Sequence, residues 1–390
     1  MIYVHIPYCR SFCTYCDFYS EVAAKCSTYE GFSSALSAEI ASREDEIRRN
    51  IQSPSGVNTL YIGGGTPSVL PLSVFGEILS SLNAVGCSLN FDEFTVEVNP
   101  EDIVEKGHRY VEGLLKSGVN RISMGVQSFD DGTLKWMNRR HDSARAKQAY
   151  AILEETGVKN ISIDLIFGLP QLSHELWEEN LSKALAISPT GMLPSHISSY
   201  QLSVEVGSAL AALMAKGKWQ EASDEVCARQ YETLCEKLRQ AGYHHYEISN
   251  FAQPGYEARH NSAYWDHVPY VGLGPGAHSY GDMVEGGPAL VRRWNNPDLP
   301  AYLEAGKSGD FSAVQDGEEL THEQLNLERL MLGLRTSKGL PMSFLNEYCS
   351  GESVGLALDK GHLMAMDNGC CRIPEDKYFI SDAIIADLSL

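Results

Sequence analysis

The chain opens with MIYVHIPYCRSFCTYCDF (residues 1–18), in which a short apolar run is followed at once by three cysteines. Cys9, Cys13 and Cys16 have the spacing C-x3-C-x2-C. In a reducing compartment, such a tight group of thiols is typical of a metal-binding or catalytic site rather than of disulfides. The apolar run is rich in β-branched and aromatic residues, so it predicts a strand that ends where the thiols begin.

Similar β-rich runs alternate with helical patterns over the first two hundred residues. After the strand from Ile2, the runs begin at Asn58, Glu93, Asn120, Asn160 and His196. The helical patterns between them cover residues 28–50, 71–85, 102–117, 143–156 and 174–187. Strands that alternate with helices predict an α/β fold with a parallel sheet and right-handed crossovers.

Polar residues at the strand ends help to decide between an open sheet and a barrel. They lie at or just beyond the C-terminal end of nearly every predicted strand: Cys9 to Cys16, GGGTP from Gly63, Glu97 with Asn99, Gln127, Asp164 and Gln201. An open sheet usually concentrates its site at one switch point, whereas a β/α barrel builds its site around the whole C-terminal rim. We therefore expect a partial (β/α)6 barrel of TIM-like type.

The regular alternation ends near residue 205, which predicts three parts. Residues 1–205 form the partial barrel, residues 206–311 extend it, and residues 312–390 form a small, mainly helical or winged domain. Within the last two parts, the sequence predicts helices over 222–241, 321–335 and 342–349 and a strand-like segment over 377–382. It also predicts a strand together with irregular loops over 243–265 and the Gly-rich segment 271–282.

Composition excludes several classes of protein. The formal net charge of −20 argues against a nucleic-acid partner, because phosphate binding depends on clustered Lys and Arg. No apolar run approaches the length of a membrane span, and the first residues lack the features of a secretory signal. We expect a cytoplasmic protein without a transmembrane segment, and peripheral membrane contact stays open.

The three thiols leave the question of a fourth ligand. A structural zinc site closes with four protein ligands, and His5 and Cys26 are the nearby candidates, although neither completes a common paired-ligand zinc signature. A cubane iron-sulfur cluster held by three thiolates instead leaves one iron free to bind a small molecule. The lack of a clear fourth ligand favours the cubane, and a structural metal site remains the alternative.

The motifs together resemble the radical S-adenosylmethionine superfamily. YVHIPYC, YIGGGTPS, VEVNP, RISMGVQSF, MNRRH and SIDLIFGLP occur in the order typical of the branch that contains coproporphyrinogen III dehydrogenases (HemN) and haem chaperones (HemW). The resemblance implies a [4Fe–4S] cluster on Cys9, Cys13 and Cys16. In that family, the open iron binds S-adenosylmethionine, and an electron from the cluster cleaves the sulfonium to give methionine and a 5'-deoxyadenosyl radical.

The resemblance also implies a set of residues around S-adenosylmethionine. Gly64, Gly65 and Thr66 match positions beside its amino group and methionyl part, Arg139 suits its carboxylate and Asp164 its ribose hydroxyls. The remaining matching positions are Glu97, Gln127, Tyr3 and Tyr15. For the charged residues the alternative is an internal salt-bridge network, and for the tyrosines it is simple packing. For GGGTP the alternative is a tight strand-to-helix turn, which we expect to account for one glycine and not three.

Two features decide the branch. The last cluster thiol is followed by Asp17 and Phe18, where HemN-type enzymes carry a further cysteine, and the first strand begins at residue 2, which we expect to leave no room for the N-terminal extension of those enzymes. HNSAYW (260–265) and GLGPGAHSY (272–280) also resemble HemW. The resemblance implies a haem chaperone that delivers haem to proteins such as respiratory enzymes and that needs a reductant. The alternative is oxidative decarboxylation of coproporphyrinogen III to protoporphyrinogen IX. His260 is the leading candidate for a haem ligand, and His244, His245 and His278 compete with it.

Overall fold

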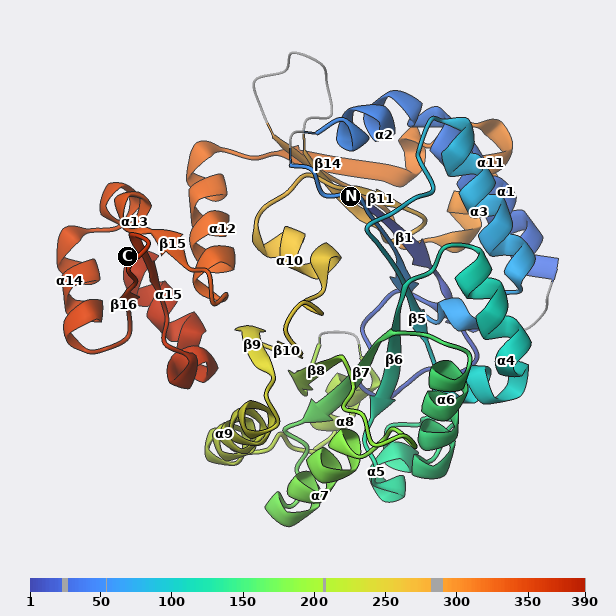
Figure 1. Ribbon diagram of the computed structural model, residues 1–390. Helices are drawn as coiled ribbons and strands as arrows, with labels where there is room; N and C mark the ends of the chain where they lie inside the picture. The colour runs from blue at the N-terminus through green and yellow to red at the C-terminus, as the bar shows by residue number, and fades with distance from the viewer. Residues whose placement is uncertain (23–26, 54, 206–207, 282–289, 390) are drawn as a thin grey trace.

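The computed structural model describes residues 1–22, 27–53, 55–205, 208–281 and 290–389. Its central feature is a nine-stranded sheet (Figure 1). The strand order is β11 (Val271–Leu273), β1 (Ile2–Ile6), β4 (Thr59–Gly64), β5 (Glu93–Val98), β6 (Arg121–Gln127), β7 (Asn160–Phe167), β8 (His196–Gln201), β10 (Asn250–Ala252) and β9 (His244–Glu247). The strands from β11 to β8 are parallel, and β10 is antiparallel to both of its neighbours.

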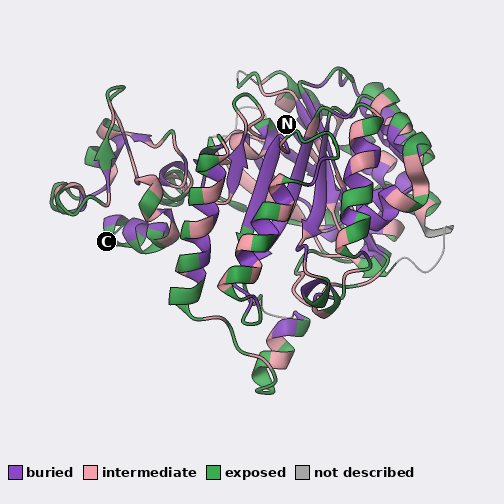
Figure 2. Cartoon of the chain, turned by 60° about the horizontal axis from the view of Figure 1, so that its bottom comes forward, coloured by how far each residue is buried: buried purple, intermediate pink, exposed green. Residues whose placement is uncertain are grey.

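All six predicted strands are present, and helices connect them. These helices are α1 (Ser27–Ser42), α2 (Glu44–Ile51), α3 (Leu72–Ala84), α4 (Pro100–Lys116), α5 (Asp131–Trp136), α6 (Ser143–Glu155) and α7 (His174–Leu185). Figure 2 shows the strands as buried and the helices as exposed on their outer faces. The sheet order ends at β11 and β9 without closing, so the prediction of a partial barrel is confirmed.

The Gly-rich segment after residue 270 is not the irregular loop that we expected. It forms β11, which adds a seventh parallel strand beside β1, and β12 (His278–Gly281). A side chain at Gly272 would collide with the carbonyl group of His278. Glycine is therefore required because two strands of backbone approach each other closely here. In the sequence, a glycine needed for close packing cannot be told apart from a glycine in a loop.

The remaining elements lie on either side of the barrel. α8 (Ala209–Ala215), α9 (Asp224–Gln240) and α10 (Arg259–Trp265) follow β8, and β12 forms a small antiparallel sheet with β13 (Val291–Asn295) and β14 (Gln315–Glu319), beside α11 (Leu299–Ser308). HNSAYW thus forms most of α10, which contacts β4. No helix in the described ranges is both long and apolar enough to cross a membrane.

The C-terminal unit is mainly helical, as expected, and it also carries a three-stranded antiparallel sheet that the sequence did not reveal. Its elements are α12 (His322–Leu334), β15 (Leu340–Pro341), α13 (Met342–Tyr348), α14 (Gly351–Asp359), β16 (Met364–Ala365), β17 (Cys370–Arg372) and α15 (Ser381–Ser389). The strand expected over 377–382 is wrong, because a 3-10 helix covers Glu375–Ile380 and continues into α15. Pro374 starts this turn by accepting a hydrogen bond from the Lys377 amide. The three-part division of the chain stays a prediction.

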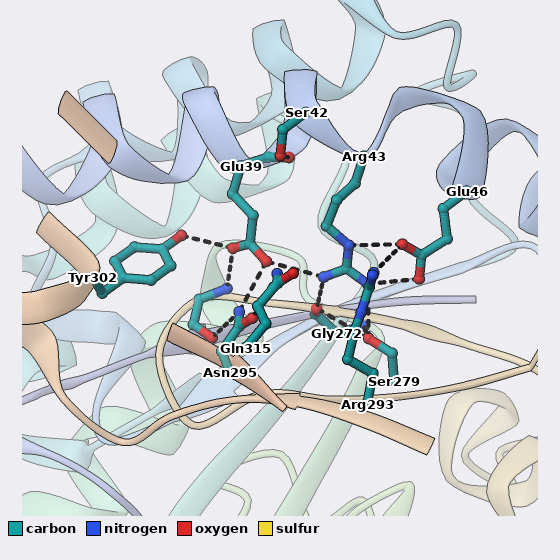
Figure 3. Close-up of polar contacts among 11 residues, drawn as sticks. Glu39, Ser42, Arg43, Glu46, Gly272, Ser279, Arg293, Asn295, Tyr302 and Gln315 are labelled. Carbon is teal, nitrogen blue, oxygen red and sulfur yellow. Dashed lines mark hydrogen bonds and ion pairs between the residues drawn. The ribbon is translucent and has the colours of Figure 1, made fainter. Parts of the chain in front are cut away.

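A buried ion network ties the first helices to the Gly-rich strands (Figure 3). The Arg43 guanidinium lies between α1 and α2 and donates five hydrogen bonds. Three of them reach the carboxylates of Glu39 and Glu46, and the other two reach the Gly272 carbonyl of β11 and the Ser279 hydroxyl of β12. Because a guanidinium has five N–H donors, every donor is satisfied.

Candidate cofactor-binding site

A cavity of about 860 Å³ lies at the C-terminal ends of the parallel strands. Its walls come from the loop after β1 and from the ends of β4, β5, β6, β7 and β8. Nearly all residues that the sequence assigned to the cluster and to S-adenosylmethionine line it: Cys9, Cys13, Tyr15, Cys16, Gly64, Gly65, Thr66, Glu97, Gln127, Arg139 and Asp164. The rim argument from the sequence therefore correctly located the hollow.

The cysteine loop is held by the segment MNRRH (137–141). The Thr14 amide donates to the Met137 carbonyl at 3.2 Å, and the Asn138 side chain donates to the Phe12 carbonyl at 2.6 Å. Asn138 adopts a left-handed backbone conformation (φ 59°), which asparagine tolerates better than most residues. The motif thus fixes the shape of the loop that carries Cys13.

The thiols are free, and two of them touch polar side chains. Cys9 Sγ lies 3.3 Å from Thr66 Oγ1, and Arg139 Nη1 donates to Cys13 Sγ at 3.6 Å. Burial raises the pKa of Cys16 to about 11, and it also raises the pKa of Cys9. Because metal ligands must be thiolates, metal binding here would release protons.

The donor set consists of three thiols on one loop. No three His, Cys, Asp or Glu side chains in the described residues are grouped closely enough to hold one metal ion, and this includes the loop thiols. Each thiolate of a cubane binds a different iron, so a cubane does not need such close grouping. His5 is occupied, since its ring nitrogens lie 3.0 Å from Tyr3 Oη and 2.8 Å from the Tyr19 carbonyl oxygen, and Cys26 is outside the described residues. This donor chemistry fits the cubane better than a four-ligand zinc site.

The three glycines of GGGTP are explained by packing within the chain, contrary to our expectation. A Cβ at Gly64, which has φ 105°, would lie 2.6 Å from the His5 ring, and one at Gly65 would lie 2.7 Å from the Tyr8 carbonyl oxygen. A Cβ at Gly63 would collide with Tyr61 and Glu97. Packing within the chain accounts for all three positions, so the glycines alone do not indicate a ligand.

Two acids face the cavity with raised pKa values. Burial raises the pKa of Glu97 to about 7, although the Tyr61 hydroxyl donates to it at 2.6 Å and the Gly64 amide at 3.1 Å. Burial likewise raises the pKa of Asp164 to about 6, against the attraction of Arg121 and hydrogen bonds from Ser198 and Ser123. Carboxylates that lack enough positive charge nearby fit a cationic ligand such as a sulfonium.

Gln127 and Arg139 also line the cavity. Gln127 ends β6 at a bulge and is one of three non-glycine residues in the described chain with positive φ (65°), a form of backbone strain common at functional sites. Arg139 donates to the Gly125 carbonyl at 2.7 Å and to Asn99 Oδ1 at 2.8 Å. Its buried Nε has no partner among the described atoms, which fits an incoming carboxylate.

Tyr3 and His260 lie outside the cavity lining. The Tyr3 hydroxyl forms a hydrogen bond with His5 Nδ1 at 3.0 Å. His260 is 0% exposed, with Nδ1 2.8 Å from the Thr59 hydroxyl and Nε2 3.1 Å from the Tyr264 hydroxyl. Its ring also packs against Tyr61 with centroids 5.1 Å apart. The haem-ligand role of His260 stays a prediction, and this burial weighs against it in the conformation described.

The competing histidines are placed differently. His244 pairs with Glu257 and is half exposed, whereas His245 is buried against Phe251. His278 is exposed and stacks on Trp294. None of the three lines the cavity.

Sequence reasoning missed several polar residues of the site. Arg121 is 1% exposed inside the barrel, and Glu93 and Asp164 raise its pKa against the opposing effect of burial. Asn99 was noted at the rim but given no role. Other cavity residues without a predicted role are Tyr61, Ser123, Ser198 and Tyr200. An inward-facing charge on a predicted strand, as in Arg121, is the signal that could have revealed them.

Stability should depend on pH through Glu97. A carboxyl with a pKa of about 7 in the folded chain and an ordinary 4.5 in the unfolded chain binds protons on folding, so stability is lost as the pH rises between these values. We expect the titration of Glu97 to lower the free energy of unfolding by about 1–2 kcal/mol across this pH interval. Solvent in the cavity keeps the effect below that of a fully buried carboxyl. Urea unfolding of the cluster-free protein at several pH values measures it. Glu97→Gln should flatten the slope, and an unchanged slope would disprove the assignment.

His260 should matter for stability. His260→Ala removes a fully buried ring and leaves the Thr59 and Tyr264 hydroxyls without their partner, so we expect a loss of about 2–4 kcal/mol. His244→Ala is the control, because its half-exposed ion pair should contribute less than about 1 kcal/mol. Both values come from urea unfolding. Equal, small losses would show that the His260 ring is not packed as described.

Comparisons with known proteins agree with this architecture. Residues 3–184 match the family model described as the Radical SAM superfamily. The chain is 34% identical over 343 residues to the "Heme chaperone HemW" of Synechocystis sp., a match covering 87% of this chain and 78% of the relative. It is also 34% identical over 340 residues to the protein of that name from Bacillus subtilis, covering 87% and 84%.

One solved structure resembles the whole chain. It is the coproporphyrinogen III oxidase HemN from Escherichia coli, described as a radical SAM enzyme, with a TM-score of 0.78 and 20% sequence identity. The match covers 100% of this chain and 89% of that chain. At this identity, the likeness concerns the fold alone.

Proposed function

Because the chain belongs to the HemN/HemW branch of the radical SAM superfamily, we propose that it is a haem chaperone that carries a [4Fe–4S] cluster and binds S-adenosylmethionine. The observation that carries the proposal is the similarity to relatives named HemW over most of both chains. The loop with three thiols on the wall of the cavity supports the cofactors.

The cluster would be held by Cys9, Cys13 and Cys16. When bound and reduced, it supplies one electron to S-adenosylmethionine at its open iron. Arg139 would pair with the carboxylate of that molecule, and Asp164 would accept hydrogen bonds from its ribose hydroxyls. The other proposed contacts are Tyr3, Tyr15, Gly64, Gly65, Thr66, Glu97 and Gln127. Tyr3 would act indirectly, since it lies behind the lining.

The chain's own contribution is to hold charged side chains in fixed orientations in the cavity. Glu97 is fixed by the Tyr61 hydroxyl and the Gly64 amide, so its charge is directed at one place in the cavity. The guanidinium of Arg139 is likewise held by Asn99 and the Gly125 carbonyl. Groups that are held before the ligand arrives need little reorganisation when it binds.

Coproporphyrinogen III dehydrogenase is the second candidate function. The likeness to the HemN fold favours it, but Phe18 stands where the enzymes of that type carry a further cysteine. Phe18 lines the cavity and is 69% exposed, so this position offers an apolar ring at the mouth instead of a thiol. We therefore rank the chaperone first.

The partners follow from the chaperone proposal. They are haem, haem-accepting proteins such as respiratory enzymes, and a reductant for the cluster, with the protein placed in the cytoplasm. Peripheral membrane contact fits delivery to respiratory enzymes. The histidine that binds haem is taken from the candidates His260, His244, His245 and His278.

One anaerobic sample can test the proposal. The reconstituted protein is analysed for iron and sulfide, titrated with S-adenosylmethionine and haem, and assayed with coproporphyrinogen III. We expect about four irons and four sulfides per chain, saturable binding of both ligands and no protoporphyrinogen IX. Formation of protoporphyrinogen IX would establish the second candidate instead. A single tightly bound zinc would overturn both.

A further inference from the structure

A chain of four polar contacts connects two of the cysteine thiols. Cys9 Sγ lies 3.3 Å from Thr66 Oγ1, and Asn99 Nδ2 donates to that hydroxyl oxygen at 3.3 Å. At its other end, Asn99 Oδ1 accepts from Arg139 Nη2 at 2.8 Å, and Arg139 Nη1 donates to Cys13 Sγ. Asn99 is the middle member, between the β4 side of the site and the segment after α5.

The side chain of Asn99 is in an unusual situation for its position. Asn99 is the N-cap residue of α4, where an asparagine normally accepts a hydrogen bond from an amide of the first turn. It makes no such cap bond, and its side chain is directed to Thr66 and Arg139 instead. Asn99 therefore lacks the stabilising N-cap hydrogen bond, and its side chain contacts two residues of the cavity wall instead.

The orientation of the Asn99 amide is fixed by its partners. A guanidinium only donates, so the atom facing Arg139 must be the carbonyl oxygen Oδ1. The amide nitrogen must then face Thr66 and donate to its hydroxyl oxygen. The Thr66 hydroxyl can then donate its hydrogen to Cys9 Sγ, because a thiolate sulfur can only accept a hydrogen bond.

The backbone of Asn99 is anchored as well. Its amide donates to Ser68 Oγ at 3.0 Å, and the Ser68 hydroxyl donates to Asp102 Oδ2 at 2.7 Å. Ser68 and Asp102 are both fully buried. The side chain thus projects from a rigid point, which suits a residue that positions others.

We propose that Asn99 is a positioning residue that sets the hydrogen bonds donated to the cluster thiolates of Cys9 and Cys13. It directs the Thr66 hydroxyl to Cys9 and holds the Arg139 guanidinium beside Cys13. Hydrogen bonds to cluster sulfurs stabilise the more negative, reduced cluster and so raise its reduction potential. The inference rests on the proposed function, because it needs a cluster on these thiolates.

The test compares Asn99→Ser with the wild-type protein. Serine is also a preferred N-cap residue, so α4 should form while the amide is lost. We expect a more negative midpoint potential in a redox titration followed by electron paramagnetic resonance. We also expect binding of S-adenosylmethionine to weaken about three- to tenfold, because Arg139 loses one of its fixed partners.

A double-mutant cycle separates positioning from general damage. Thr66→Val removes the hydroxyl without changing charge, so the potential shift from Asn99→Ser should be smaller in the Thr66→Val background than in the wild type. Equal shifts in both backgrounds would overturn the path through Thr66. Asn99→Asp keeps the acceptor for Arg139, and it should restore the affinity for S-adenosylmethionine but not the potential.

Asn180→Ser is the matched control. Asn180 is a buried asparagine that bridges Ser128 and the Phe129 amide outside the cavity, so its loss should lower stability without moving the potential. If the wild-type protein holds a cluster and Asn99→Ser leaves its potential unchanged, the inference is wrong although the proposed function stands. If the wild-type protein holds no cluster, the proposed function itself fails.

Discussion

Protein with Cys13→Ala is expected to bind almost no iron-sulfur cluster after anaerobic reconstitution. Only two thiols of the donor set would remain, and a cubane lacking two protein ligands exposes two of its irons. Iron and sulfide should fall from about four per chain to near zero. Cleavage of S-adenosylmethionine should disappear with them, because the open iron that binds it is gone.

Cys13 suits this test better than Cys9 does. It is only half buried, whereas Cys9 is buried, so removing its sulfur leaves no cavity in the core. The variant should therefore unfold at nearly the same urea concentration as the cluster-free wild-type protein. Loss of the cluster can then be assigned to the missing ligand and not to misfolding.

Cys349→Ala provides the control for this experiment. Cys349 is a buried thiol at the end of α13 in the C-terminal unit. The Cys349→Ala protein should be somewhat less stable but should retain a full complement of iron. Cys13→Ala protein with full iron and sulfide would show that another side chain completes the site. That result would revive the four-ligand alternative, for which Cys26 is a candidate.

The strands and the rim of the barrel were accessible from sequence because each depends on local pattern. Short β-rich runs mark the parallel strands, and polar residues at or just beyond the ends of these runs mark the same edge of the sheet. Glu97 and Asp164 were located in this way without any knowledge of their contacts, although the structure places both within strands, in β5 and β7. Their raised pKa values depend on burial, which the pattern cannot specify.

The errors arise where glycine or a long-range contact determines the structure. Gly272 has the appearance of a loop residue, yet it allows β11 to pack against β12. Likewise, Gly64 and Gly65 of GGGTP are required by His5 and Tyr8, which are more than fifty residues away in the chain. The haem-ligand role of His260 stays a prediction, and the sequence could not show that its ring contacts the Thr59 hydroxyl, 201 residues away in the chain.

Asn99 shows the same limit at the level of a single side chain. In the sequence, an asparagine before Pro100 is an ordinary helix start. Only the structure shows that its amide faces Thr66 and Arg139 instead of the helix. The sequence Asn99-Pro100 is fully explained as the start of α4. It therefore gives no sign that the Asn99 side chain positions other residues.

Arg43→Met is expected to destabilise the protein by about 3–5 kcal/mol, as is typical when one partner of a buried ion network is removed. The substitution keeps a long side chain but leaves the carboxylates of Glu39 and Glu46 without the guanidinium that neutralises them. Glu39 is 0% exposed, and its other contacts are neutral donors from Gly274, Asn295 and Tyr302. Those donors cannot replace a full positive charge, although Arg293 still contacts Glu46.

Arg48→Met is a control with the same chemical change one turn away. Arg48 forms an i,i+4 pair with Glu44 on the surface of α2, where the two side chains are 48% and 46% exposed, so its loss should cost less than about 1 kcal/mol. Urea unfolding of the cluster-free proteins measures both changes. If the two substitutions have similar effects, the network in Figure 3 does not stabilise the fold as argued. A large difference would instead support a structural role for the Arg43 guanidinium outside the cavity. There it contacts β11, the strand that pairs with β1 just before the cysteine loop.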